Sequence, residues 1–202
     1  MTIEHNGLII IGENFNTSRK IKGSSPRVVH EGDKYSLTYT NLDGDKASLD
    51  ITDGFPTEPA EQKNYMIPHI THALKNDDID YITWIVKNQE LNGAHIIDLC
   101  VDEITHYPEE RLEWMRKAVG VMQSITDKPL SLDSSDGDTV MAGLEVYDRE
   151  KEPGRTFDNI PRPVHGVPML PRAFQASSWH CSNDTNWDDL QQISSTSWSD
   201  LR

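Results

Sequence analysis

Cysteines and long hydrophobic runs are both scarce in this sequence, and each shortage excludes a class of protein. The 202 residues include only two cysteines, Cys100 and Cys181, whose spacing fits neither a metal site nor a disulfide framework, so we expect free thiols. No apolar run approaches the roughly 18 residues that a membrane span requires. The first residues also lack the basic start and apolar centre of a signal peptide. We therefore expect a cytoplasmic protein that does not associate with membranes.

Basic residues are few relative to acidic ones. The chain has 33 Asp and Glu residues against 19 Lys and Arg residues, for a net charge of -14 at pH 7. A surface with this balance repels a polyanion, so we expect no nucleic-acid partner. The length is enough for one ordinary domain, or part of a larger one, with a real hydrophobic core.

Apolar, strand-like runs alternate with amphipathic, helix-like segments along the first 150 residues. We expect buried strands at residues 7–12, 94–102 and 129–133, and helices at residues 77–92, 108–125 and 138–148. Asp77 or Asp78 is the expected cap of the first helix, and Gly93 its end. Pro108 suits the first turn of the second helix. Apolar strands that alternate with helices indicate a parallel α/β sheet.

Two segments depart from this alternation. Residues 24–66 interrupt it, and within them "KYSLTYT" and "ASLDIT" flank a turn at Asp43 and Gly44, which predicts a β-hairpin in a surface insertion. Residues 151–202 contain five prolines by residue 171 and then a polar, Ser-rich stretch with three tryptophans. Dense prolines disfavour both helix interiors and strand ladders, so we expect an irregular tail with one short helical turn near residues 188–193.

Polar side chains gather where each of the three expected strands ends. They are Glu13, Asn14 and Asn16 after the first strand, Asp98 and Asp102 around the second, and Asp133, Ser134, Ser135 and Asp136 after the third. Parallel strands present these ends on one face of the sheet, so the groups converge there. Simpler roles stay open for each residue taken alone: a turn for Asn16, bonds to loop N–H groups for Asp98, and a helix cap for Asp136.

The strand ends also carry a family resemblance. The stretch "LIIIGENFNTS" resembles the opening of the pterin-binding TIM-barrel family, an apolar strand followed by Gly-Glu-x-x-Asn. "GAHIIDLCVD" is similar to the second strand of that family, and "KPLSLDSSD" to its third strand, which ends in Leu-Asp-Ser. The family includes dihydropteroate synthases, methyltetrahydrofolate:corrinoid methyltransferases and the folate module of cobalamin-dependent methionine synthase. Gly-Glu-x-x-Asn favours the methyltransferase branch, and the resemblance covers residues 7 to about 148.

The resemblance implies a fold, a ligand and a reaction. The fold is a partial (β/α)8 TIM barrel of about three βα units in residues 1–150, with the hairpin insertion after the first strand. Asn16, Asp98 and Asp133 match positions that line the pterin pocket, and Glu13, Asn14, Ser134 and Asp136 are further candidates. The implied substrate is methyltetrahydrofolate, whose N5-methyl group passes to cobalt(I) of a corrinoid on another protein or domain.

The sequence departs from the family at two places. Cys100 stands where the methyltransferases usually carry an Asn, and no fourth strand with an Asn-Ser pair follows Asp148. We therefore expect an incomplete barrel, in which the reading frame leaves the ancestral one near residue 150. Alternatively, the tail covers the half-barrel, or a second copy of the chain completes the sheet as a homo-oligomer. The function is then a methyltransferase module, a non-catalytic folate binder or scaffold, or a dihydropteroate synthase-like enzyme.

Two further groups of side chains have simple interpretations. His69 and His72 lie three residues apart, but no nearby Cys or Glu completes a zinc set, so we expect no metal site and assign both to a loop or helix start. The basic stretch at residues 19–23 suits a phosphate, or the glutamate tail of a folate-like ligand, or a solvated loop. The solvated loop is the favoured interpretation.

Overall fold

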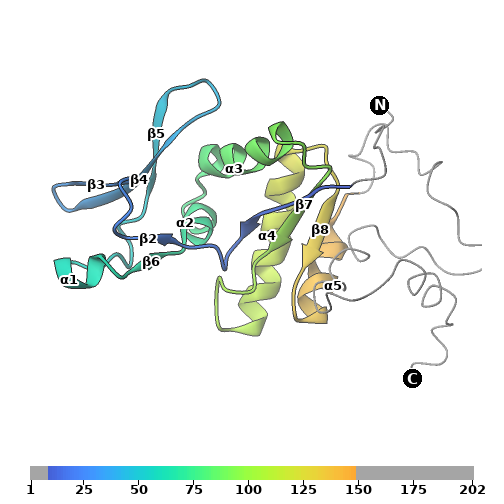
Figure 1. Ribbon diagram of the computed structural model, residues 1–202. Coiled ribbons are helices and arrows are strands. Elements are labelled where there is room, and N and C mark those ends of the chain that lie inside the picture. The colour runs from blue at the N-terminus through green and yellow to red at the C-terminus, as the bar shows by residue number, and fades with distance from the viewer. Residues whose placement is uncertain (1–8, 149–202) are drawn as a thin grey trace, which may run out of the picture.

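The computed structural model of the chain describes residues 9–148 (Figure 1). The strands are β1 (Ile11–Asn16), β2 (Ile21–Lys22), β3 (Val28–Glu31), β4 (Lys34–Thr40), β5 (Lys46–Asp50), β6 (Met66–Ile67), β7 (Ile96–Cys100) and β8 (Leu130–Asp133). The helices are α1 (Pro59–Gln62), α2 (His69–Lys75), α3 (Ile79–Leu91), α4 (Pro108–Ile125) and α5 (Gly137–Val146). The expectations for Cys181 and for residues 151–202, including the helical turn at residues 188–193, lie outside the described residues.

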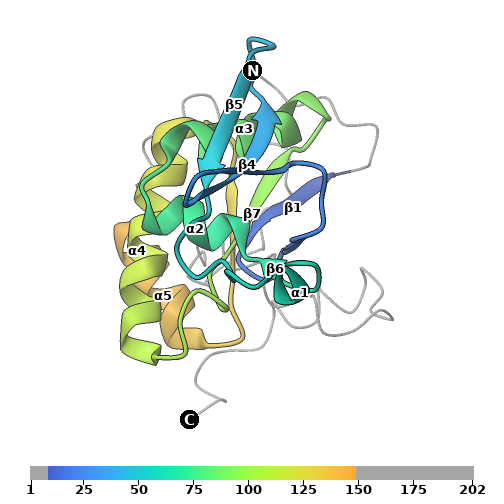
Figure 2. The same ribbon diagram turned by 90° about the vertical axis from the view of Figure 1, so that its left-hand side faces the viewer.

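The central sheet is parallel, and its strands lie side by side in chain order, β1-β7-β8. Helices follow the strands, and α4 packs against both α3 and α5. Figure 2 shows α4 and α5 to one side of the strands. The expected α/β class with a parallel sheet is confirmed. Within residues 9–148 the sheet does not close into a barrel.

Local sequence signals explain where the helices begin and end. The Asp78 carboxylate accepts a hydrogen bond from the Tyr81 amide at 2.9 Å, as an N-cap does. Gly93 follows the helix with φ +91, a conformation that glycine adopts at no steric cost. Pro108 opens α4, where its missing N–H is not needed. The predicted limits of α3 and α4 are therefore confirmed to within two residues.

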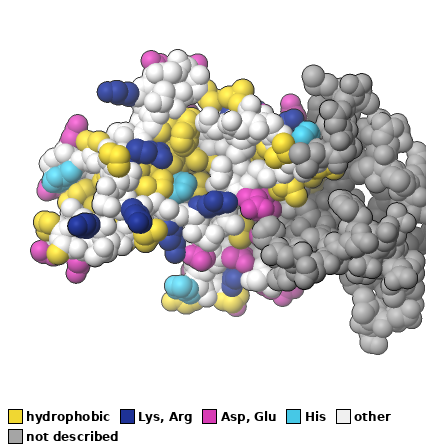
Figure 3. Space-filling model, in the orientation of Figure 1, with side chains coloured by type: hydrophobic (Ala, Val, Ile, Leu, Met, Phe, Trp, Pro, Cys, Tyr) yellow, Lys and Arg dark blue, Asp and Glu magenta, His cyan; other side chains and the backbone are white. Residues whose placement is uncertain are grey.

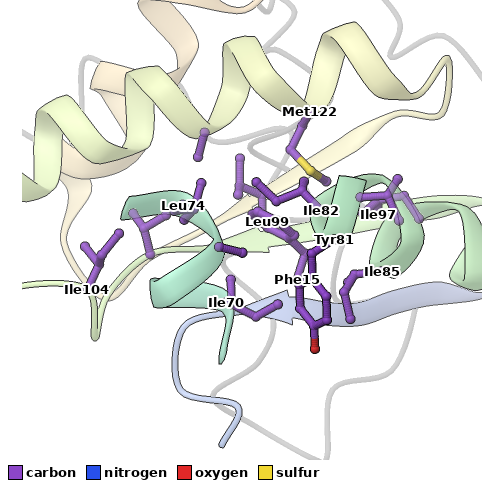
Figure 4. Close-up of a cluster of buried hydrophobic side chains, with 14 of the residues drawn as sticks. Phe15, Ile70, Leu74, Tyr81, Ile82, Ile85, Ile97, Leu99, Ile104 and Met122 are labelled. Atoms are coloured by element: carbon purple, nitrogen blue, oxygen red, sulfur yellow. The ribbon is translucent and has the colours of Figure 1, made fainter. Parts of the chain in front are cut away.

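The hydrophobic core lies between the sheet and the helices. Phe15, Leu99 and Leu132 point from three neighbouring strands into this layer and are fully buried. Figure 4 shows Phe15, Ile97 and Leu99 packed with side chains of α2, α3 and α4. Because side chains alternate along a strand, the residues between these apolar positions face the other side of the sheet.

The first strand differs from its prediction. The expected strand at residues 7–12 is confirmed only at Ile11 and Gly12, because β1 spans Ile11–Asn16; residues 7 and 8 lie outside the described part of the chain. Ile9, Ile10 and Ile11 are between 40% and 48% exposed rather than buried on both faces. The reason is that β1 pairs only with β7 in the described part of the chain, so its N-terminal half lies at a sheet edge. Phe15, further along, supplies the buried side chain.

The insertion after β1 is larger than a hairpin. The predicted hairpin is confirmed as β4 and β5, and β3 adds a third antiparallel strand. The short antiparallel pair of β2 and β6 closes the base of the insertion. One face of this three-stranded sheet is buried, since Leu37, Leu49 and Ile51 are 0% exposed. Tyr39 packs against Tyr81 and Trp84 of α3, so the insertion contributes to the core as well as to the surface.

Because the insertion shares its core with the central sheet, weakening it should destabilise the whole described fold. We expect Leu49→Ala to lower the free energy of unfolding by about 2–5 kcal/mol, the usual cost of a large-to-small change in a core. Ser48→Ala, at the exposed neighbouring position, is the matched control. Urea unfolding followed by both tryptophan fluorescence and circular dichroism measures the change. Two separate transitions, with only the first one shifted, would contradict a shared core.

Candidate functional site

The three residues expected to bind a ligand lie on one face of the central sheet. Asn16 pairs in register with Cys100, and Cys100 pairs with Asp133 on the next strand. Asp98 and Ser131 form the neighbouring pair, two residues back along the same strands. These residues alternate with the buried apolar ones, so they share the face opposite the core described above.

Strand geometry sets the size of this polar face. Neighbouring strands lie about 4.8 Å apart, so the backbones of Asn16 and Asp133 are about 10 Å apart, with Cys100 between them. Asp98 lies two residues from Cys100 along β7, which is about 6.6 Å. Two carboxylates and an amide therefore surround Cys100 at the carboxyl ends of three parallel strands, where α/β proteins place ligand contacts. We call Asn16, Asp98, Cys100, Ser131 and Asp133 the polar row.

The thiol at the centre of the polar row is a poor nucleophile near pH 7. Burial, followed by the charges of Asp102, Asp133 and Asp98, raises the pKa of Cys100 to about 12. A hydrogen bond from the backbone N–H of Asp102 acts in the opposite direction but does not overcome this effect. The thiolate is the nucleophilic form. Cys100 therefore stays protonated near pH 7, as a small, weak hydrogen-bond donor.

Asp102 ties together the two loops that leave β7 and β8. Its carboxylate accepts hydrogen bonds from the Ser134 hydroxyl at 2.5 Å and from the Ser135 amide and hydroxyl, each at 2.9 Å. The Ser134 hydroxyl also accepts from the Asp136 amide at 3.1 Å. Ser134, a further candidate for ligand binding, is thus engaged in holding the loop that follows Asp133.

Asp136 caps α5. Its carboxylate accepts from the Thr139 hydroxyl at 2.7 Å and from the Asp138 amide at 3.3 Å. The hydrogen bond from the Thr139 hydroxyl is the main cause that lowers the pKa of Asp136. These contacts match the capping role that stayed open for this residue in the sequence.

The loop after β1 is joined to the loop after β7. The Thr17 amide donates to the Cys100 carbonyl at 3.0 Å, and the Thr17 hydroxyl accepts from the Glu103 amide at 3.0 Å. The Asn16 side-chain oxygen accepts from the Ser18 amide at 2.8 Å, which is the turn role considered above. The Asn16 side-chain amide nitrogen keeps two donors in addition to this bond.

Two of the three basic side chains at residues 19–23, Arg19 and Lys20, lie beside acidic residues. Lys20 forms an ion pair with Glu103 at 2.8 Å, and Arg19 lies 3.9 Å from the Glu13 carboxylate. The Arg19 side chain also donates to the Glu13 carbonyl at 3.3 Å. Figure 3 shows Lys and Arg side chains scattered among acidic ones on this face rather than gathered in one patch. The arrangement fits the favoured interpretation of a solvated loop.

Glu13 and Asn14 lie away from the polar row. Both open onto a hollow of about 310 Å³ along the edge of β1, which Arg19 and Gln89 also line. A second hollow, of about 280 Å³, lies at the N-terminal ends of α4 and α5 and includes Asp136. The structure therefore brings Asn16, Asp98 and Asp133 together and places the four further candidates elsewhere or in structural roles.

The histidines of α2 are buried. His69 begins the helix, as expected, and its Nδ1 lies 3.0 Å from the Tyr81 hydroxyl. Burial is the main cause that lowers the pKa of His69 to about 4, and burial also lowers the pKa of His72. Among the described residues, no group of three or more His, Cys, Asp or Glu side chains is placed to hold a metal ion. None of the helices in residues 9–148 could span a membrane.

Two residues near the site were not singled out from the sequence. Ser131 is 2% exposed and belongs to the polar row; the alternation in "PLSLD" places it on the same face as Asp133 and could have identified it. Gln89 of α3 is 5% exposed, and its side-chain oxygen accepts from the Asn14 amide at 2.8 Å. No sequence signal indicates this contact, because it depends on how α3 packs against β1.

Comparison with known proteins gives no family for this chain. No family model matches the sequence, and no curated protein matches it. The positions of Asn16, Asp98 and Asp133 therefore carry the functional inference.

Proposed function

We propose that this chain is a pterin- or folate-binding module of the methyltransferase type, which binds methyltetrahydrofolate on the polar row. The observation that carries the proposal is the placement of Asn16, Asp98 and Asp133 on one face, at the carboxyl ends of three neighbouring parallel strands. Sequence resemblance selects these residues as a pterin site. The strand register, which is independent of the resemblance, brings them together.

The side chains in the polar row fit the chemistry of a pterin. One edge of a pterin offers adjacent N–H donors from its ring amide and exocyclic amine. Carboxylates accept such pairs of hydrogen bonds, and Asp133 is half-buried at the end of β8, where a ligand can reach it. Asp98 supplies a second acceptor, and Asn16 supplies amide donors for a ring carbonyl or nitrogen. The residues thus bind and orient the ring.

The order of the elements supports a partial (β/α)8 barrel as the finer description of the fold. In such a barrel, consecutive strands are neighbours, each strand is followed by a helix, and the helices form one outer layer. The order β1-β7-β8 and the packing of α4 between α3 and α5 fit the first three units. The polar row then corresponds to the inner, carboxyl-terminal face, where barrel enzymes bind substrates.

Methyl transfer is the reaction that we propose for this module. Bound methyltetrahydrofolate supplies the methyl group, and a corrinoid on a partner protein or domain is the acceptor. The chain's own contribution is to position the pterin. Cys100 supports a second candidate, a non-catalytic folate binder. A protonated thiol that replaces the family's Asn lacks an amide's acceptor, so one polar contact to the ring is absent.

A ligand series tests which part of the substrate the chain recognises. We expect methyltetrahydrofolate and 6-hydroxymethylpterin to bind in equilibrium dialysis, because both carry the pterin edge that the polar row would contact. We expect p-aminobenzoylglutamate, which has the tail of folate but no pterin, not to bind. Binding of the tail fragment alone would contradict the proposal and point to a site for the glutamate instead.

An assay of methyl transfer separates the two candidates. Wild-type chain and Cys100→Asn are each mixed with methyltetrahydrofolate and free cob(I)alamin, and methylcobalamin is followed by its absorption. Transfer by the wild-type chain supports the enzyme. Transfer only by Cys100→Asn, or binding without any transfer, supports the non-catalytic binder. The first of these two outcomes would also show that transfer requires an amide side chain at residue 100.

A further inference from the structure

One strand of the central sheet contains an extra residue. Gly12 pairs with Ile97 and Phe15 pairs with Leu99, so three steps along β1 span two steps along β7. This is the arrangement of a β-bulge, which inserts a residue into one strand and re-aims the side chains that follow it.

The bulge decides which face of the sheet Asn16 occupies. Side chains alternate between the two faces along a strand, so one extra residue reverses the assignment of every later position. With the bulge, Phe15 enters the core and is 0% exposed, while Asn16 pairs with Cys100 in the polar row. If β1 continued from Ile11 without the bulge, Phe15 would stand beside Cys100 and Asn16 would point toward the core.

Gln89 holds the bulge in place from the helix layer. Its side-chain oxygen accepts from the Asn14 amide, inside the bulge, at 2.8 Å. Its side-chain nitrogen donates to the Ile85 carbonyl at 3.3 Å, which orients the amide group. Gly12 allows the close approach, since a Cβ there would lie 2.6 Å from the same Gln89 oxygen. The Asn14 amide is only part-buried, and this contact supplies its acceptor in the bulged register, so the hydrogen bond favours that register.

We propose that Gln89 is a positioning residue for the ligand site: by accepting from the Asn14 amide, it fixes the bulge that turns Asn16 onto the face of Asp98 and Asp133. The effect on the ligand rests on the proposed function. The effect of Gln89 on the direction of the residue 16 side chain does not rest on the proposed function, and it can be measured without any ligand.

A disulfide trap reports the direction of residue 16. Residues 16 and 100 are paired neighbours on adjacent strands, about 4.8 Å apart, which lies within the range of Cα distances that a disulfide bridges. We expect Asn16→Cys to cross-link with Cys100 under copper phenanthroline at pH 9, where the half-buried new thiol at position 16 supplies the thiolate, as scored by mass spectrometry of the intact, alkylated chain. All variants carry Cys181→Ser, so that Cys100 is the only other thiol.

Removing the support for the bulge should prevent this cross-link. We expect Gln89→Met to slow cross-linking by up to about tenfold, the effect of losing one part-buried hydrogen bond. Ile82→Met, at another buried position of α3, is the matched control and should leave the rate unchanged. Equal rates in the two variants would overturn the proposal.

A second variant keeps the test decisive if Gln89→Met does not fold. Gly12→Ala leaves Gln89 in the sequence but pushes its oxygen away from the Asn14 amide. We expect the same loss of cross-linking. Cross-linking at the wild-type rate in folded Gly12→Ala would overturn the proposal.

Ligand binding provides a measurement that would not change if Gln89 had only a structural role. We expect Gln89→Met and Asn16→Ala to weaken methyltetrahydrofolate binding by similar factors, and the double variant to bind no more weakly than either. If the two losses of affinity multiply in the double variant, the coupling between Gln89 and Asn16 is overturned. If the wild-type chain binds no pterin but cross-linking still depends on Gln89, the proposed function fails while the positioning role stands.

Discussion

We expect Asp133→Asn to lower the affinity for methyltetrahydrofolate about 100-fold, because in the proposed site it would remove the acceptor of a pair of charge-assisted hydrogen bonds worth roughly 3 kcal/mol. Asparagine has almost the same size and shape as aspartate. Its amide group, however, presents donors toward the N–H donors of the pterin, and it lacks the negative charge. Asp133 closes β8 beside Cys100, so the change alters the polar row without touching the core.

A control at the other end of β8 separates this effect from the loss of a charge anywhere on the chain. Asp127 is exposed and precedes the strand. Asp127→Asn makes the same chemical change outside the polar row, and we expect unchanged affinity. Calorimetric titration gives both dissociation constants, and thermal unfolding shows whether each variant is folded. Equal affinities for folded Asp133→Asn and wild type would remove Asp133 from the site.

We expect acidification from pH 7 to pH 4 to lower the free energy of unfolding by about 3 kcal/mol through the buried His69. The pKa of His69 is about 4 in the folded chain and 6.5 in an unfolded one. Below pH 6.5 the unfolded chain therefore binds a proton that the folded chain does not bind. The contribution of neutral His69 to the free energy of unfolding is fully present above pH 6.5, falls as the pH decreases, and levels off near pH 4. His72, whose pKa burial also lowers, adds a loss of the same sign.

Substitution at His69 should flatten this pH dependence. His69→Gln keeps a polar group beside the Tyr81 hydroxyl but does not titrate. We expect urea unfolding to show a shallower loss of stability between pH 6.5 and pH 4 than in wild type, with the remaining slope coming from His72. His106→Gln, at an exposed position, is the matched control. A wild-type slope in His69→Gln would show that another group causes the acid sensitivity.

The sequence predicted the elements that depend on local signals. The apolar spacing of α3 and α4, the cap at Asp78 and the glycine at Gly93 are all contained within a few neighbouring residues. The turn of the β4–β5 hairpin is equally local, with Gly44 at φ +90. Asp98 and Asp133 could be assigned to one site because parallel strands present their carboxyl ends on one face of the sheet, and the register of β7 and β8 agrees with this.

Features that depend on packing could not be predicted. Six of the seven residues of α2 are buried, including His69, Thr71 and His72, so its sequence shows no apolar stripe. These polar residues are buried because the helix packs between α3 and the insertion sheet. The bulge in β1 depends on Gln89, which is more than 70 residues away in sequence. The sequence placed Asn16 among the polar groups at the strand ends, and family resemblance selected it as a site residue, but neither signal indicated that a bulge sets the direction of its side chain.

Calorimetric titration of the whole chain with methyltetrahydrofolate at pH 7 measures directly whether the polar row binds a pterin. It should be performed at two temperatures, because the enthalpy of binding changes with temperature and can vanish at one of them. We expect a saturable heat from a single class of site. If a chain that unfolds cooperatively in urea gives no heat at either temperature, the polar row does not hold a pterin, and the resemblance records ancestry rather than function.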